Sequence, residues 1–215
     1  MGQRWSDLLI AEHEALETLR AAEISAAVSQ IFRIENQTYL EVQRFDRTGL
    51  AGRLGVTSLL AIDSNFYGAL DNWIEAARRL HQERRIDAQT LDDIRLISCF
   101  ADLIANTDKH FGNLAFYDNY DGRFQLTPVY DMLPMLFAPT HDQLPARIYK
   151  PSDPTSDTLK VWGRARVLAE SYWQALAANG RLSANFRAIC SACLHSLKSL
   201  PRTGAYAATQ SAGHS

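Results

Sequence analysis

Apolar residues recur every three or four positions through most of the chain, which is the spacing of one helix face. This pattern predicts helices at residues 5–22, 66–81, 88–105, 159–178 and 183–199. The stretch at 88–105 is long and apolar, and Asp87 stands at its N-cap position. We expect this helix to end near Ala105, because the Asn106 and Thr107 that follow favour caps and turns.

Two hairpins are predicted between the helices. Runs rich in β-branched and aromatic residues pair 28–34 with 38–43, and 114–117 with 123–126. Glu35-Asn36 supplies the first turn, and residues 118–122 supply a second turn rich in Asp, Asn and Gly. Residues 48–65 carry three glycines but no strand–Gly-x-Gly-x-x-Gly pattern, so a flexible loop is expected there rather than a phosphate-binding one.

Composition narrows the function classes. The net charge of −2 gives no electrostatic case for direct nucleic-acid binding, and 47% hydrophobic residues suffice for a sizeable core. No apolar run approaches 18 residues and the N-terminus is polar, so neither a membrane span nor a signal peptide is expected. The chain has three cysteines, of which only Cys190 and Cys193 have the spacing of a redox or zinc-binding pair. Because no second pair is present, buried thiols in a reducing cytoplasm are expected rather than a zinc or redox site.

The loop after the long helix carries the candidate chemistry. Asp108 and Asn113 are five positions apart, the interval that phosphotransfer loops use for a base and a metal-binding amide. Asp131 follows the second hairpin, where such sites place a second metal ligand. A loop, a hairpin and a carboxylate would thus surround a nucleotide-bound Mg²⁺. Asp and Asn also crowd ordinary loops, and His110 alone is as readily a structural residue.

The residues around these positions resemble the HipA family of kinases. Ile-Ala-Asn-Thr-Asp-Lys-His-Phe-Gly-Asn at 104–113 matches the family pattern I-G-N-T-D-x-H-x-x-N, and Leu-Thr-Pro-Val-Tyr-Asp at 126–131 matches L-x-P-x-Y-D. The resemblance covers about residues 5–200. It implies an α+β, protein-kinase-like C-terminal lobe, mainly helical, with short β-hairpins and a remnant of the N-terminal lobe.

The resemblance also implies roles for single residues. Asp108 would be the catalytic base, with His110 near the phosphates, and Asn113 and Asp131 would bind Mg²⁺. In the helix at 5–22, Glu12 resembles the family glutamate that helps to organise the nucleotide site, although a solvated position is the other reading.

The segment Leu-Glu-Val-Gln-Arg-Phe-Asp-Arg at 40–47 resembles the family segment V-E-R-F-D-R, which connects the lobes and meets adenine. Gln43 replaces the usual Glu and can still offer an acceptor. Phe45 could stack near the base or simply belong to the core. The charged residues beside it are predicted to form a structural ion-pair cluster.

The resemblance matches only the back part of the family architecture. Residues 1–47 are expected to be the remnant of the N-lobe, 48–202 the helical catalytic lobe, and 203–215 a disordered tail. No Gly-rich strand pair precedes residue 5, and no lysine lies on an N-terminal strand. Lys109 could neutralise a transferred phosphoryl group or point to solvent. An exposed apolar patch around Trp5, Phe32 and Tyr39 is expected where a missing lobe would dock.

Three functions fit this sequence. The first is an ATP- and Mg²⁺-dependent Ser/Thr protein kinase of a type II toxin–antitoxin system, acting on a protein substrate, with an antitoxin or a separate N-terminal subunit as partner. The second is a truncated, catalytically weak or inactive kinase-like module that binds nucleotide or protein. The third is a scaffold that holds a partner without chemistry, which would have no need for Asp108, Asn113 and Asp131 together.

Overall fold

The structure is a computed structural model that describes residues 2–119, 121–141 and 143–201. Its helices are α1 (Gly2–Ala21), α2 (Leu59–Phe66), α3 (Trp73–Gln82), α4 (Ala88–Leu103), α5 (Leu159–Ala178) and α6 (Ala184–Lys198), with 3-10 turns at Phe111–Asn113 and Met135–Phe137. Its strands are β1 (Ser29–Ile34), β2 (Gln37–Val42), β3 (Arg47–Thr48), β4 (Gly52–Arg53), β5 (Val56–Ser58), β6 (Ala115–Asp118) and β7 (Phe124–Leu126). The tail predicted at 203–215 lies outside the described residues.

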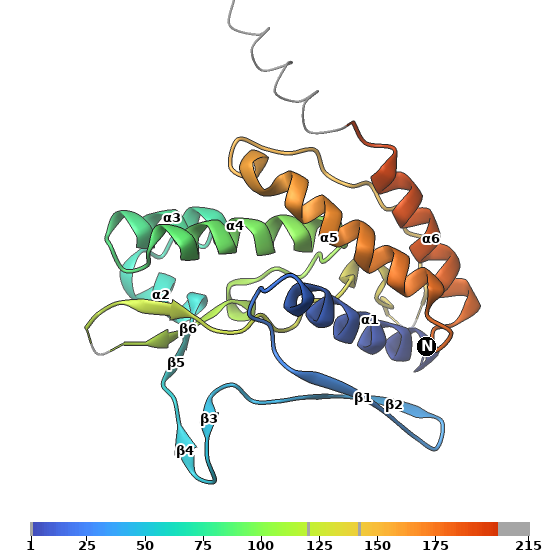
Figure 1. Ribbon diagram of the computed structural model, residues 1–215, viewed down its shortest axis with the longest axis horizontal. Coiled ribbons are helices and arrows are strands. Elements are labelled where there is room, and N and C mark those ends of the chain that lie inside the picture. Colours follow the sequence, from blue (N-terminus) through green and yellow to red (C-terminus); the bar gives the residue numbers. More distant parts are fainter. Residues whose placement is uncertain (1, 120, 142, 202–215) are drawn as a thin grey trace, which may run out of the picture.

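The helices pack around α4 and α5. α4 contacts α3 on one side and α5 on the other, while α5 also contacts α1 and α6 (Figure 1). The largest fully buried side chains are Trp162, Trp173, Tyr172, Phe100, Phe116 and Phe186. Aromatic side chains of this size bury the most apolar area per residue, so they supply much of the driving force for folding. Among the described residues, no helix combines the length and apolar character that a bilayer crossing needs.

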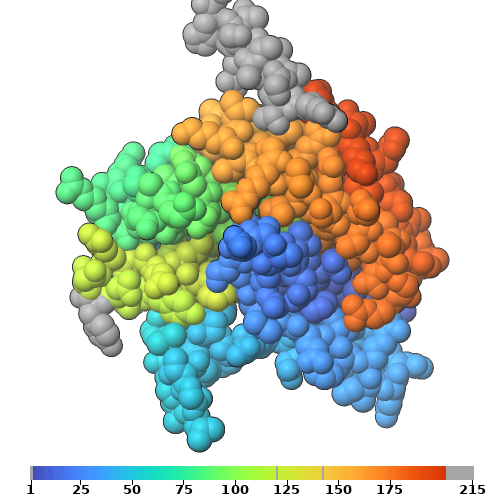
Figure 2. Space-filling model, viewed as in Figure 1, coloured from blue at the N-terminus to red at the C-terminus, as the bar shows by residue number. Residues whose placement is uncertain are grey.

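The strands form small antiparallel sheets at the edge of this helical body. β1 pairs with β2 in a hairpin against α1, β3 pairs with β4, and β5, β6 and β7 form a three-stranded sheet. Figure 2 shows the β1–β2 and β3–β4 hairpins as two separate projections from the body. On this side Trp5 and Tyr39 are 42% and 46% exposed, as predicted, whereas Phe32 is partly buried.

Two predictions between residues 48 and 81 were wrong. The expected loop at 48–65 contains β3 to β5 and α2, and the helix expected at 66–81 begins only at Trp73. Asn72 is the N-cap of α3, because its side chain accepts hydrogen bonds from the backbone N–H groups of Ile74 and Glu75 at 3.0 Å. Gly68 lies before it with φ +64°, a conformation that glycine adopts without strain.

Side-chain hydrogen bonds fix both the start and the end of α4. Asp87 caps its start, as predicted, since its carboxylate accepts from the Thr90 N–H at 2.7 Å. The helix ends at Leu103, two residues before the predicted position. The carbonyl of Leu103 accepts from the Trp173 indole at 3.0 Å and the Tyr149 hydroxyl at 2.6 Å. Trp173 of α5 and Tyr149 of an irregular segment thus hold the point where the candidate loop begins.

Removal of the Trp173 side chain is expected to destabilise the chain strongly. Trp173→Ala opens a cavity in the core and removes a hydrogen bond to Leu103, so the free energy of unfolding should fall by about 3–5 kcal/mol. Trp5→Ala is the matched control, since Trp5 is 42% exposed and should lose less than about 1 kcal/mol. Urea unfolding followed by circular dichroism measures both. Equal losses would contradict this packing.

Candidate active site

The loop after α4 is held in shape by its own side chains. The Asn106 side-chain oxygen accepts from the Asp108 N–H at 3.0 Å, and the Asn113 amide donates to the Asp108 carbonyl at 3.1 Å. Trp73 of α3 donates its indole N–H to the His110 carbonyl at 3.1 Å. These bonds use backbone groups, so the Asp108 carboxylate stays exposed and accessible.

A hydrogen bond from Gly112 fixes the tautomer of the neutral His110 ring. Its Nδ1 accepts a hydrogen bond from the Gly112 N–H at 3.0 Å, so a neutral ring carries its proton on Nε2. A Cβ on residue 112 would approach the His110 ring to 2.9 Å, so glycine is the residue that leaves room for this contact. The exposed ring therefore presents an N–H donor rather than a base.

Asp131 follows β7 and lies against α1. Its backbone has φ +55°, a left-handed conformation in which Asp is better tolerated than most residues. Its backbone N–H lies near the carboxyl group of Glu12, which is 9% exposed. Glu12 and Asp131 therefore lie close together in the fold, although they are far apart in the sequence.

The carboxylates of this region influence one another. Burial, and secondarily the charge of Asp131, raise the pKa of Glu12 to about 7 against the opposing hydrogen bond. Burial also raises the pKa of Asp131, with the charge of Asp108 acting in the same direction. His110 and a hydrogen bond from Asn113 act against this rise. The negative charges of Asp108 and Asp131 thus act on each other, which favours a cation near them.

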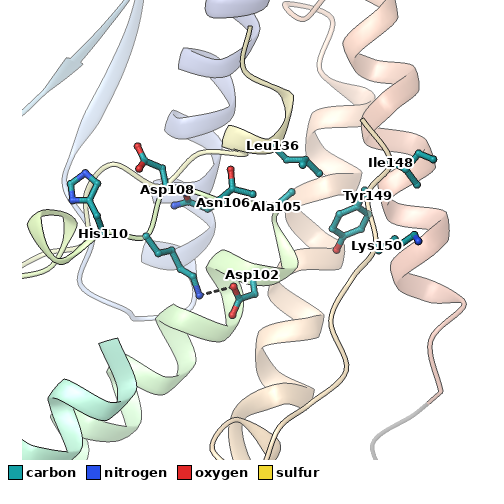
Figure 3. Close-up of a pocket in the computed structure, with 11 residues that line it drawn as sticks. Asp102, Ala105, Asn106, Asp108, His110, Leu136, Ile148, Tyr149 and Lys150 are labelled. Atoms are coloured by element: carbon teal, nitrogen blue, oxygen red, sulfur yellow. Dashed lines mark hydrogen bonds and ion pairs between the residues drawn. The ribbon is translucent and has the colours of Figure 1, made fainter. Parts of the chain in front are cut away.

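Two pockets flank these carboxylates. A pocket of about 400 Å³ is lined by Glu12, Val42, Gln43, Arg44, Phe45, Asp46, Val56, Tyr130 and Asp131. A wider cleft of about 710 Å³ is lined by Asp102, Ala105, Asn106, Thr107, Asp108, Lys109, His110, Leu136, Ile148, Tyr149 and Lys150 (Figure 3). We name them the hinge pocket and the loop cleft. Asp131 belongs to the first and Asp108 to the second.

The structure brings the predicted site residues together in two groups. Glu12, Gln43, Phe45 and Asp131 line the hinge pocket, while Asp108 and His110 line the loop cleft. Asn113 is buried and lines neither, but its side-chain amide donates to the Asp108 carbonyl and lies near enough to Asp131 to lower the pKa of that carboxyl. It therefore connects the two groups.

Lys109 takes neither of its predicted positions. Its ammonium turns back onto α4, where it pairs with Asp102 at 2.5 Å and contacts the carbonyl and hydroxyl of Ser98 at 3.3 Å. The charge of Lys109 is compensated there, so the ammonium is neither directed at Asp108 nor left in solvent.

Sequence reasoning missed Tyr130 and Lys150. Tyr130 packs on Phe45 with ring centroids 5.6 Å apart, and its hydroxyl donates to the Gly112 carbonyl at 2.7 Å. It stands next to Asp131 in the matched motif, which was the available signal. Lys150 lies in an irregular segment without a motif, so no signal identified it. The ion-pair cluster beside Phe45 is confirmed, since Arg44 pairs with Asp46 at 2.6 Å.

The donor set suits a magnesium ion that also has ligands from outside the protein. Among residues 2–119, 121–141 and 143–201, no group of three His, Cys, Asp or Glu side chains could hold a metal alone. Mg²⁺ commonly takes one or two protein oxygens and completes its shell with water and phosphate. Asp131 offers a carboxylate, and the Asn113 nitrogen is engaged, which leaves its side-chain oxygen for a cation. These residues fit Mg²⁺ bound together with a nucleotide.

Stability is expected to fall as the pH rises from about 5 to 8. Folded Glu12 keeps its proton up to a pKa of about 7, whereas an unfolded glutamate releases it near 4.5. The folded chain therefore binds more protons in this range, and deprotonation favours unfolding by an amount on the order of 3 kcal/mol. Urea unfolding at several pH values measures this slope.

Glu12→Gln should flatten most of this slope, because the amide does not titrate. A smaller slope of the same sign remains from Asp131 and Glu14, whose pKa values are also raised by burial. Glu41→Gln, at an exposed position of β2, is the control and should leave the slope unchanged. An unchanged slope in Glu12→Gln would mean that Glu12 is not the group that titrates.

Comparisons with known proteins identify the family of this chain. The family model of the HipA-like C-terminal domain matches residues 2–199. Toxin YjjJ of Escherichia coli K12 is 41% identical over 192 residues, which is 88% of this chain and 43% of that protein. The chain thus spans less than half the length of this curated relative.

Two solved structures share the fold at low sequence identity. HipA from the Shewanella oneidensis MR-1 complex of HipA, HipB and operator DNA superposes with a TM-score of 0.64 at 14% identity, covering 89% of this chain and 55% of that chain. The Helicobacter pylori proinflammatory kinase CtkA superposes with a TM-score of 0.59 at 12% identity, covering 88% and 82%. These neighbours confirm the predicted α+β, protein-kinase-like fold. With the family model matching nearly its whole length, this chain belongs to the HipA-like C-terminal domain family.

Proposed function

We propose that this chain is the catalytic part of a Ser/Thr protein kinase that transfers the γ-phosphate of ATP to a protein hydroxyl. The observation that carries the proposal is a pair of pockets, one lined by Asp131 and the other by Asp108, with Asn113 bonded to the backbone of Asp108. A phosphotransferase needs a donor site and an acceptor site with a base and a metal between them. The hinge pocket is the donor site in this proposal, and the loop cleft is the acceptor site.

Each residue has a distinct role in the transfer. Asp108 receives the proton of the acceptor hydroxyl as the phosphoryl group passes to that oxygen. Asn113 and Asp131 hold Mg²⁺, which when bound neutralises phosphate charge. His110 directs its Nε2–H at a phosphate oxygen, because its Nδ1 is engaged with Gly112. Glu12 acts through the neighbouring Asp131, beside which it lines the hinge pocket.

The hinge pocket accommodates the base of the nucleotide. Phe45 and Tyr130 provide aromatic surface, Val42 and Val56 add apolar surface, and Gln43 supplies a polar group at the rim. This combination of apolar walls and few polar groups is typical of sites for small ligands. The likeness to Toxin YjjJ and to HipA supports a toxin role, with an antitoxin as protein partner.

A second function is favoured by one observation. No lysine lines the hinge pocket in the described parts of the chain, and Arg44 is paired with Asp46. A cation that holds the α- and β-phosphates must therefore come from elsewhere, such as the remaining half of a longer protein or a separate subunit. Without it, the chain would be a kinase-like module that binds nucleotide or a protein partner with little catalysis.

Calorimetric titration of ATP into the wild-type chain tests the donor site. We expect saturable binding with Mg²⁺ present and much weaker binding when EDTA removes the ion. Absence of binding at millimolar Mg-ATP would overturn the donor-site assignment for this chain.

A further inference from the structure

The far wall of the loop cleft is a short segment anchored by Tyr149. Its hydroxyl donates to the Leu103 carbonyl at 2.6 Å, and its ring lies 5.8 Å from the Trp173 ring. In Figure 3, Asp108 and His110 lie on one side of the cleft, and Ile148 and Lys150 lie on the other. The buried Tyr149 thus fixes the positions of its sequence neighbours Ile148 and Lys150 in this wall.

Ile148 gives this wall an exposed apolar surface. The side chain is 80% exposed although it borders a cleft, and the partly buried Leu136 lines the same space. An apolar side chain of a bound peptide would remove both from water, which is favourable in proportion to the area covered.

Lys150 gives the same wall an uncompensated positive charge. The cleft also contains Lys109, but that ammonium is paired with Asp102. Lys150 makes no hydrogen bond or ion pair with any residue in the described parts of the chain. Asp108 places negative charge at the opposite end. An acidic side chain is therefore attracted to the Lys150 end, whereas a basic one is repelled.

We propose that Ile148 and Lys150 determine substrate specificity by selecting a serine or threonine in a peptide that carries adjacent acidic and apolar side chains. The acceptor hydroxyl lies at Asp108, and the acidic and apolar pair lies on the wall formed by Lys150 and Ile148. This inference rests on the proposed function, because it assigns the loop cleft to the acceptor.

Peptide binding without nucleotide tests the inference separately from catalysis. The probes are fluorescent alanine-based peptides with a central serine, in which a Glu-Leu pair is moved position by position along the peptide. A matched set carries Lys-Leu. Fluorescence anisotropy should show one placement at which Glu-Leu binds about fivefold more tightly than Lys-Leu, as expected for an exposed ion pair.

Two variants test whether Lys150 and Ile148 cause this preference. Lys150→Glu should reverse the preference at the same placement, and Ile148→Ser should weaken both peptide sets. Lys160→Glu, an exposed lysine of α5 outside the cleft, is the control and should change neither. Equal affinities for both sets, no measurable binding of either, or a preference that survives Lys150→Glu would overturn the proposal.

The same peptides distinguish this proposal from the proposed function. If Glu-Leu peptides bind selectively but receive no phosphate from Mg-ATP, the kinase activity fails and the peptide site stands. If peptides are phosphorylated with no preference for Glu over Lys, the kinase stands and the specificity assignment fails.

Discussion

Asp108→Asn is expected to lower phosphoryl transfer by about a thousandfold while leaving ATP binding unchanged. A general base contributes roughly 10²–10⁴ in rate, and an amide cannot take the proton of the acceptor hydroxyl. The substitution should not unfold the chain, since the Asp108 side chain is exposed and its backbone bonds to Asn106 and Asn113 remain.

The measurement for Asp108→Asn is transfer of labelled γ-phosphate to a serine- and threonine-containing peptide library, beside calorimetric titration of Mg-ATP. Asp121→Asn is the matched control, because this exposed aspartate of the β6–β7 turn lines neither the hinge pocket nor the loop cleft. Transfer that continues at the wild-type rate in Asp108→Asn would remove Asp108 from the catalytic role.

Asp131→Asn is expected to weaken Mg²⁺-dependent ATP binding by about 100-fold or more. Side chains that merely support a metal ligand are already worth about 10–100-fold in metal affinity. Asparagine is the informative replacement because it tolerates the left-handed φ of +55°, whereas alanine would add backbone strain. The variant therefore changes the charge of the ligand and little else.

The effect of Asp131→Asn should depend on the metal. Titration of ATP in the presence of EDTA should give similar weak affinities for the wild type, Asp131→Asn and the Asp121→Asn control. A loss of ATP affinity that persists without Mg²⁺ would mean that Asp131 shapes the pocket instead of binding the ion.

Local patterns predicted those parts of the fold whose determinants are close in sequence. Apolar periodicity identified α4 and α5, and Asp87 was correctly identified as the cap of α4. The β6–β7 hairpin followed from its turn residues. The failure between residues 48 and 81 came from treating glycines as a loop signal, whereas Leu59 and Ile62 of the short α2 are buried in the core.

The candidate site was harder to predict because long-range contacts assemble it. The loop motif identified Asp108 and Asn113, but the contact of Glu12 with the Asp131 backbone depends on how α1 packs. The pairing of Lys109 with Asp102 requires the loop to fold back on α4. Lys150 reaches the cleft only because Tyr149 is anchored to Leu103. None of these contacts has a signature in local spacing.

The most direct test of the central claim is detection of the reaction product. The wild-type chain would be incubated with Mg-ATP and the serine- and threonine-containing peptide library, and the phosphorylated residues would be identified by mass spectrometry. The kinase account predicts phosphoserine or phosphothreonine that depends on Mg²⁺ and is absent with Asp108→Asn. Saturable Mg-ATP binding without any phosphorylated peptide would contradict it and would favour the kinase-like binding module.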